Sequence, residues 1–138
     1  MAVETSGVIH IVWPTLVSEG VPQKALFYAT SRDGKTFSPR TRVPTAGVTN
    51  PSHPQLTLTP DGGAVIVWDE IMNGTGRVSM TRVSRPGTFM PPQVLSEHEP
   101  ASFPVTVLPA TGDLLVAWTS RSSPDQSMIR LRRLTVQK

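Results

Sequence analysis

Apolar residues along this chain gather in short runs that follow a glycine and end at a tryptophan. The run occurs three times, at 7–13, 63–68 and 112–118, and the copies together contain all three tryptophans. In the middle copy the apolar residues are continuous, which is typical of a strand buried on both faces. The pattern therefore predicts three equivalent buried strands.

The middle of the chain shows what surrounds each run. Residues 53–59 alternate in polarity and predict a strand before the run, and the Pro-Asp-Gly-Gly stretch at 60–63 predicts a tight turn into it. Residues 77–83 alternate again, and 93–95 predict a short fourth strand. The unit is therefore expected to be a four-stranded antiparallel meander.

The same template fits the rest of the chain. A repeat of about 50 residues with four short strands is typical of one blade of a β-propeller. The sequence thus predicts an all-β fold of three four-stranded antiparallel blades in one domain, 1–138, with blades at about 1–49, 50–99 and 100–138. The first blade begins inside its first strand. The last lacks its fourth strand, because its third is expected at 128–136.

The three tryptophans occupy the same place in their runs. We expect Trp13, Trp68 and Trp118 to be packed between adjacent blades and to dominate the inter-blade core, because each buries a large apolar surface. An open arc would leave the outer faces of blades one and three bare. We expect those faces to expose the residues around Trp13 and the stretch 114–118.

A turn in the first unit carries a more specific motif. The stretch Ser31-Arg32-Asp33-Gly34-Lys35-Thr36-Phe37 resembles the Asp-box of sialidase-like (bacterial neuraminidase repeat) propellers, one residue shorter before the aromatic. A decayed copy at 84–89 has Pro86 in place of the aspartate. The resemblance implies a structural role. The carboxylate accepts turn amides, the glycine adopts a positive φ and the aromatic packs onto the blade. The structural set is Ser31, Asp33, Gly34, Thr36 and Phe37.

The resemblance also has consequences for activity. It implies a six-bladed ring, of which this chain supplies half. The F-R-I-P segment and the nucleophilic tyrosine of sialidases have no match, since Tyr28, the only tyrosine, lies in mid-strand as a packed aromatic. No catalytic residue is therefore carried over. The resemblance further implies an exported or periplasmic protein, although no signal peptide is recognisable at the start of this sequence.

The composition limits which sites and partners this chain can have. The absence of cysteine excludes disulfides and thiolate metal sites. No apolar run approaches the roughly 20 residues that span a bilayer. Basic residues cluster only at Arg130, Arg132 and Arg133, where alternation with apolar residues predicts a solvated strand face and no nucleic-acid partner. No cofactor motif is present, and we expect neither a cofactor nor a metal.

Candidate ligand-binding residues belong to one end of the blades, where the loops between strands two and three and between successive blades meet. They are Asn50, His53, Asp69, Glu70, His98 and Arg121. Asp69 and Glu70 are conceivable as general acid and base. Because neighbours on a strand point to opposite sides, capping of loop amides is the favoured interpretation.

The histidines also have two interpretations each. His98 stands between Glu97 and Glu99, where solvation is favoured over metal binding. His53 is favoured as a structural hydrogen-bonding residue over a ligand contact. His10 lies among apolar neighbours and is expected in the core or at a strand edge.

Three functions are compatible with this sequence. The leading one is a non-catalytic binding or assembly module that recognises protein or glycan and is completed by homodimerisation, with blade three of each chain against blade one of the other. The second is an accessory subunit of a larger exported or membrane-associated complex. The third is a glycosidase-like enzyme completed by dimerisation.

Overall fold

The computed structural model describes residues 1–47, 49–84, 87–110 and 112–135 of the chain. Within these ranges it contains strands, turns and irregular segments, and no helix. No helix there could cross a membrane. The all-β class expected from the alternation and turn patterns is confirmed.

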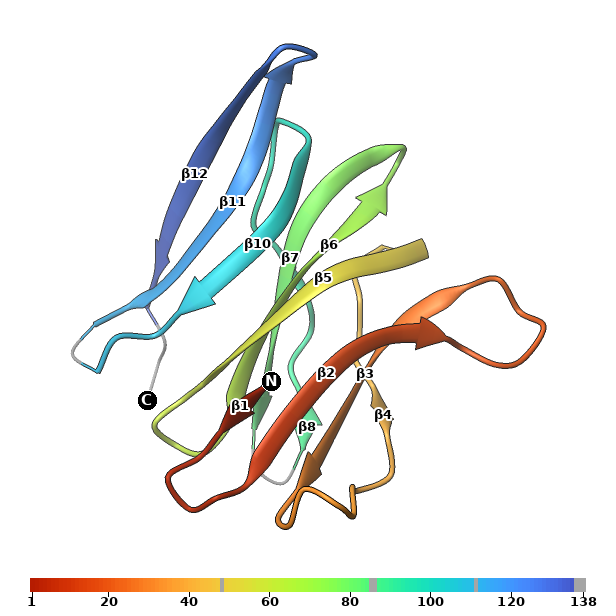
Figure 1. The fold of residues 1–138 in the computed structure, drawn as a ribbon. Coiled ribbons are helices and arrows are strands. Elements are labelled where there is room, and N and C mark those ends of the chain that lie inside the picture. The colour runs from red at the N-terminus through yellow and green to blue at the C-terminus, as the bar shows by residue number, and fades with distance from the viewer. Residues whose placement is uncertain (48, 85–86, 111, 136–138) are drawn as a thin grey trace.

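The strands form three antiparallel sheets that follow one another along the chain (Figure 1). Sheet 1 has the order β1-β2-β3-β4, with strands β1 (Ala2–Val3), β2 (Ile9–Leu16), β3 (Lys24–Ser31) and β4 (Thr41–Arg42). Sheet 2 has the order β5-β6-β7-β8, and β9 also pairs with β7. Its strands are β5 (Thr49–Leu58), β6 (Ala64–Met72), β7 (Thr75–Ser84), β8 (Thr88–Phe89) and β9 (Gln93–Val94).

Sheet 3 has the order β10-β11-β12. Its strands are β10 (Ala101–Val107), β11 (Leu114–Ser123) and β12 (Gln126–Leu134). The third strand of the last unit was expected to reach Val136, which lies outside the described residues. None of the three sheets is closed, and side-by-side open sheets of this kind are consistent with part of a propeller.

The outermost strand of each sheet is shorter than the four-strand template predicts, or is split, or is missing among the described residues. In sheet 2 the expected fourth strand is split, because β8 and β9 pair with successive parts of β7. In sheet 3 no fourth strand follows β12 among the described residues. The inner three strands of each unit therefore match the template better than the outermost one.

Strand β6 lies between two hydrophobic clusters, which explains its continuous apolar run. Ala64, Ile66 and Trp68 belong to a buried cluster shared with sheet 1, where Leu26 and Val43 also lie. The alternate residues of β6, Val65 and Val67, belong to a second buried cluster shared with sheet 3. Side chains of successive strand residues point to opposite faces, so a central sheet needs apolar residues at every position.

The three tryptophans do not share one environment. Trp68 is fully buried between sheets 1 and 2, and Trp118 is buried between sheets 2 and 3. Trp13 lies in neither cluster, is only partly buried, and contacts Phe27 of its own sheet with ring centroids 6.3 Å apart. Among the described residues no second sheet covers Trp13, so its place between two sheets stays a prediction that depends on a partner.

The outer face of sheet 3 is the most apolar exposed surface of the fold. Its exposed side chains are those of Val105, Val107, Ile129 and Leu131. The expectation that residues 114–118 would be bare is only half correct. Leu114, Val116 and Trp118 are buried against sheet 2, and the partly buried Leu115 and Ala117 alternate with them on the outer face.

Arginines of β12 pair with acidic or carbonyl groups. Arg130 donates to Glu99 at 3.1 Å and Arg132 to the Leu95 carbonyl at 2.9 Å. These contacts join β12 to the segment that leaves sheet 2. Arg130 and Arg132 therefore help to hold sheet 3 against sheet 2.

Candidate functional site

Two connectors between sheets repeat the same short motif. The first strand of sheet 2 contains Ser52-His53-Pro54 and that of sheet 3 contains Ser102-Phe103-Pro104. Both central residues have a positive φ, 47° at His53 and 55° at Phe103, and both strands shift register at this point. A positive φ is uncommon for bulky residues and is concentrated at functional positions. The same strained geometry thus recurs at equivalent places in two sheets.

The two strained residues bring their rings together. The ring centroids of His53 and Phe103 lie 4.3 Å apart with an interplanar angle of 44°. Phe103 is 58% exposed, and the His53 side chain is about half exposed. The result is an aromatic pair, open to solvent, at the end of the molecule where the inter-sheet connectors lie. We call it the ring pair.

A buried carboxylate holds the ring pair in place. Asp69, near the end of β6, lies 2.9 Å through Oδ2 from His53 Nδ1, and the same oxygen accepts the Phe103 amide at 2.7 Å. Because an ionised carboxylate only accepts hydrogen bonds, His53 donates through Nδ1–H. Asp69 is itself buried. One carboxylate therefore ties both strained connectors to sheet 2.

Glu70, the next residue of β6, also accepts hydrogen bonds from main-chain amides, but on the other side of the strand. Its carboxylate accepts the Gly47 amide at 2.6 Å and the Ala46 amide at 3.3 Å, in the connector that precedes β5. A Cβ at Gly47 would lie 2.7 Å from Glu70 Oε2 and 2.9 Å from the Ile71 carbonyl oxygen, so only glycine fits there. Asp69 and Glu70 therefore bind main-chain amides in opposite directions and do not face a common space.

The other residues expected at this end stay apart from the ring pair. Asn50 also has a positive φ, 49°, and is exposed. His98 is exposed and 3.7 Å from Glu97, and no group of three or more metal-ligating side chains occurs among the described residues. Arg121 donates its amide to the Pro100 carbonyl at 3.0 Å. Sequence analysis missed Phe103, although the repeated Ser-x-Pro motif carried the signal.

The turn at residues 31–37, whose sequence resembles an Asp-box, lies at the opposite end of sheet 1. Asp33 Oδ1 accepts the amides of Lys35 and Thr36, both at 2.8 Å, and these amides lower the pKa of Asp33 to about 2. Gly34 has φ 70°, and its amide donates to Ser31 Oγ at 2.9 Å. Phe37 pairs with Ser31 as an isolated bridge. The turn is thus a hydrogen-bonded loop of its own. Pro86 of the decayed copy lies outside the described residues.

The comparisons with known proteins relate this chain to one fold. No protein family model matches the chain, and no curated protein matches it. Among solved structures, the crystal structure of an endo-arabinase from Bacteroides thetaiotaomicron VPI-5482 is similar, with a TM-score of 0.63 at 12% sequence identity. The match covers 99% of this chain and 55% of that one, so the chain spans about half the length of that enzyme. At this identity the likeness shows the fold alone, a propeller-like arrangement of antiparallel sheets.

Proposed function

We propose that this chain is a propeller-type module that binds a neutral glycan at the ring pair. The carrying observation is the exposed Phe103 ring, which lies tilted against His53 and is fixed by the hydrogen bond from its amide to Asp69. Sugar rings have apolar C–H faces that lose contact with water when they lie on an aromatic ring. The likeness to an endo-arabinase makes arabinan-type oligosaccharides the first ligands to test.

Preorganisation supports this proposal. The positive φ of Phe103 and the hydrogen bond that its amide donates to Asp69 hold the aromatic ring at the surface before any ligand arrives. A preformed site loses less conformational entropy on binding. Beside it, His53 is oriented through Nδ1, which leaves Nε2 to face a sugar hydroxyl. The sialidase-like type inferred from the Asp-box stays part of this proposal.

Isothermal titration calorimetry with short arabino-oligosaccharides tests the site. Phe103→Ala is expected to weaken binding about tenfold, the equivalent of 1.4 kcal/mol. Met90→Ala is the control, because Met90 is similarly exposed, at 55%, and belongs neither to the ring pair nor to the outer face of sheet 3. Thermal melting of both variants checks the fold. Unchanged affinity of a folded Phe103→Ala variant for every glycan bound by the wild type would contradict the proposal.

Glycosidase activity is the second candidate, and the likeness to an endo-arabinase favours it. Glycoside hydrolysis generally needs two carboxyl groups roughly 5–10 Å apart across the scissile bond. Asp69 and Glu70 face opposite connectors, so one member of such a pair would come from another chain or segment. Turnover of arabino-oligosaccharides that is lost in Asp69→Asn would favour this candidate. Binding without turnover favours the module.

Assembly completes the proposal. The joint between sheets 2 and 3 pairs Val65 and Val67 with Leu114 and Trp118. Sheet 3 presents an apolar face where a further sheet would pack, and sheet 1 presents Trp13 in the position that Trp68 and Trp118 occupy within joints. We propose that two copies join these faces into a six-bladed ring. A hetero-complex that buries the same faces is the alternative, and co-purifying chains would identify it.

A further inference from the structure

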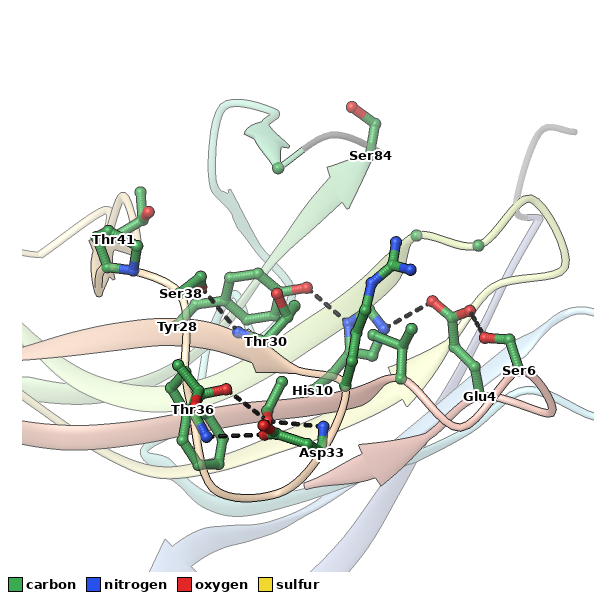
Figure 2. A pocket seen from close by; sticks show the side chains of 18 residues that line it. Glu4, Ser6, His10, Tyr28, Thr30, Asp33, Thr36, Ser38, Thr41 and Ser84 are labelled. Atoms are coloured by element: carbon green, nitrogen blue, oxygen red, sulfur yellow. Dashed lines mark hydrogen bonds and ion pairs between the residues drawn. The ribbon is translucent and has the colours of Figure 1, made fainter.

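A hollow of about 1070 Å³ lies at the opposite end of the molecule from the ring pair. Its walls come from the β1–β2 turn, from β2 and β3, from the Asp-box turn and from two turns of sheet 2 (Figure 2). This volume is near the upper end of the range of typical ligand sites. Neither the ring pair nor its Asp69 anchor lines the hollow.

Two buried side chains, His10 and Tyr28, and the partly buried Glu4 form a hydrogen-bonded chain along one side of the hollow. His10 Nε2 lies 2.9 Å from Glu4 Oε1, and His10 Nδ1 lies 2.6 Å from the Tyr28 hydroxyl (Figure 2). With a neutral imidazole, Nε2–H donates to the carboxylate and Nδ1 accepts from Tyr28. The phenolic oxygen then keeps its acceptor capacity for a ligand. Burial, and then the charge of Glu4, raise the pKa of Tyr28 to about 12, so the phenol stays protonated at neutral pH.

The rest of the lining mixes polar side chains with apolar ones, among them Val8 and Pro39. Thr30 and Thr41 bring hydroxyl groups, and Phe37, 40% exposed, brings an apolar surface. Arg32 is exposed and has no ion pair in the described part of the chain. Asp33 already accepts the amides of its own turn. The hollow therefore offers a ligand hydrogen-bond acceptors, hydrogen-bond donors and an aromatic surface.

Charge decides the class of ligand. The lining contains two carboxylates, Glu4 and Asp33, against the single guanidinium of Arg32. An anionic ligand would meet a net negative surface, and desolvating a charge without a matched partner is costly. A neutral ligand rich in hydroxyl groups satisfies both the phenolic acceptor of Tyr28 and the donors of Arg32.

We propose that the hollow is a second, independent site for a neutral sugar, at the opposite end of the module from the ring pair. Two glycan sites on one module would allow it to bind neighbouring stretches of one polysaccharide or to link two chains. Such bivalent binding raises the apparent affinity without any new contact. The inference extends the proposed glycan-binding function, and its test separates the two sites.

The three histidines make the two sites separately observable. His10 reports the hollow, His53 reports the ring pair, and His98, exposed at the surface, serves as the internal control. Imidazole 15N resonances are followed by NMR while a short arabino-oligosaccharide is added to the full chain. In the wild type we expect both His10 and His53 to shift with saturation, and His98 to stay still.

Variants then distinguish the sites. Phe103→Ala is expected to remove the His53 response and leave that of His10. Arg32→Ala is expected to weaken the His10 response about tenfold, as for loss of a hydrogen bond to a charged group, and leave that of His53. If the His10 resonance does not shift at sugar concentrations that saturate the His53 response, the second-site proposal alone is overturned. It is also overturned if His10 shifts and Arg32→Ala leaves that shift unchanged. A silent His53 overturns the ring-pair proposal alone.

Discussion

At the scale of single residues, a few carboxylates hold the turns and connectors of this protein. Asp69 and Glu70 accept amides from connectors on either side of sheet 2, and Asp33 accepts the amides of its own turn. Charged acceptors make stronger hydrogen bonds to amides than neutral ones. Main-chain strain at His53 and Phe103 is therefore maintained by a neighbouring buried charge.

Asp33 gives a prediction with a defined pH dependence. Its pKa is lowered from 3.8 to about 2 in the folded chain, so its contribution to stability is present above the unfolded pKa and is lost as the pH falls through the folded one. We expect Asp33→Asn to lower the melting temperature modestly at neutral pH. The difference from wild type should shrink between about pH 4 and about pH 2. Asp125→Asn, in an exposed turn of sheet 3, is the control. A difference that does not depend on pH would contradict this role.

At the scale of elements, β6 is the strand on which the fold depends most. Its two faces supply both hydrophobic clusters, and Trp68 is the largest fully buried side chain. Ser79 lies opposite Trp68 in the register of β6 and β7. The side chains of β6 therefore pack against both neighbouring sheets, while its main chain is hydrogen-bonded to β5 on one edge and to β7 on the other.

Trp68→Ala tests this dependence. Removing a buried aromatic costs about 3–5 kcal/mol, because the cavity left behind closes only in part. We expect a loss of that size in the free energy of unfolding, measured with guanidinium chloride. Met90→Ala is the comparison, since Met90 is large, apolar and 55% exposed, and it should change stability little. Equal effects of the two substitutions would show that the inter-sheet core does not limit stability.

At the scale of the whole molecule, the two ends of the sheet array differ. The outer face of sheet 1 is partly covered by its own segments, as where Arg40 stacks on Phe27 at 4.3 Å. The outer face of sheet 3 exposes Val105, Val107, Ile129 and Leu131. Contiguous apolar surfaces of this kind mark interfaces. The molecule therefore has one bare face and one partly covered face that carries Trp13.

Leu131→Glu tests whether copies associate through this face. A carboxylate buried there without a partner costs several kcal/mol, so we expect the dimer to dissociate at concentrations where the wild type is dimeric. Light scattering measures the mass, and Met90→Glu, away from this face, is the control. Leu131 is 66% exposed in the single chain, so we expect the Leu131→Glu variant to fold like the wild type. A wild type that stays monomeric and soluble at about 15 kDa would rule out the homodimer.

Local pattern by itself determined the strands and the hydrogen-bonded turn at residues 31–37. The runs that became β2, β6 and β11 are short apolar stretches between turn residues, and their backbone preference depends on near neighbours. The bonds of Asp33 connect residues no more than three positions apart. Such features need no knowledge of the rest of the chain.

Only the tertiary structure decided the sites and the environment of each strand. The ring pair and its Asp69 anchor come together because sheets 2 and 3 pack side by side. The hydrogen-bonded chain of Glu4, His10 and Tyr28 forms because separate strands of sheet 1 are neighbours. Trp13 and Trp68 end near-identical runs, yet one is partly exposed and the other fully buried. A strand's sequence sets which side chains share a face. Whether another sheet covers that face is decided by the packing of residues distant in the chain.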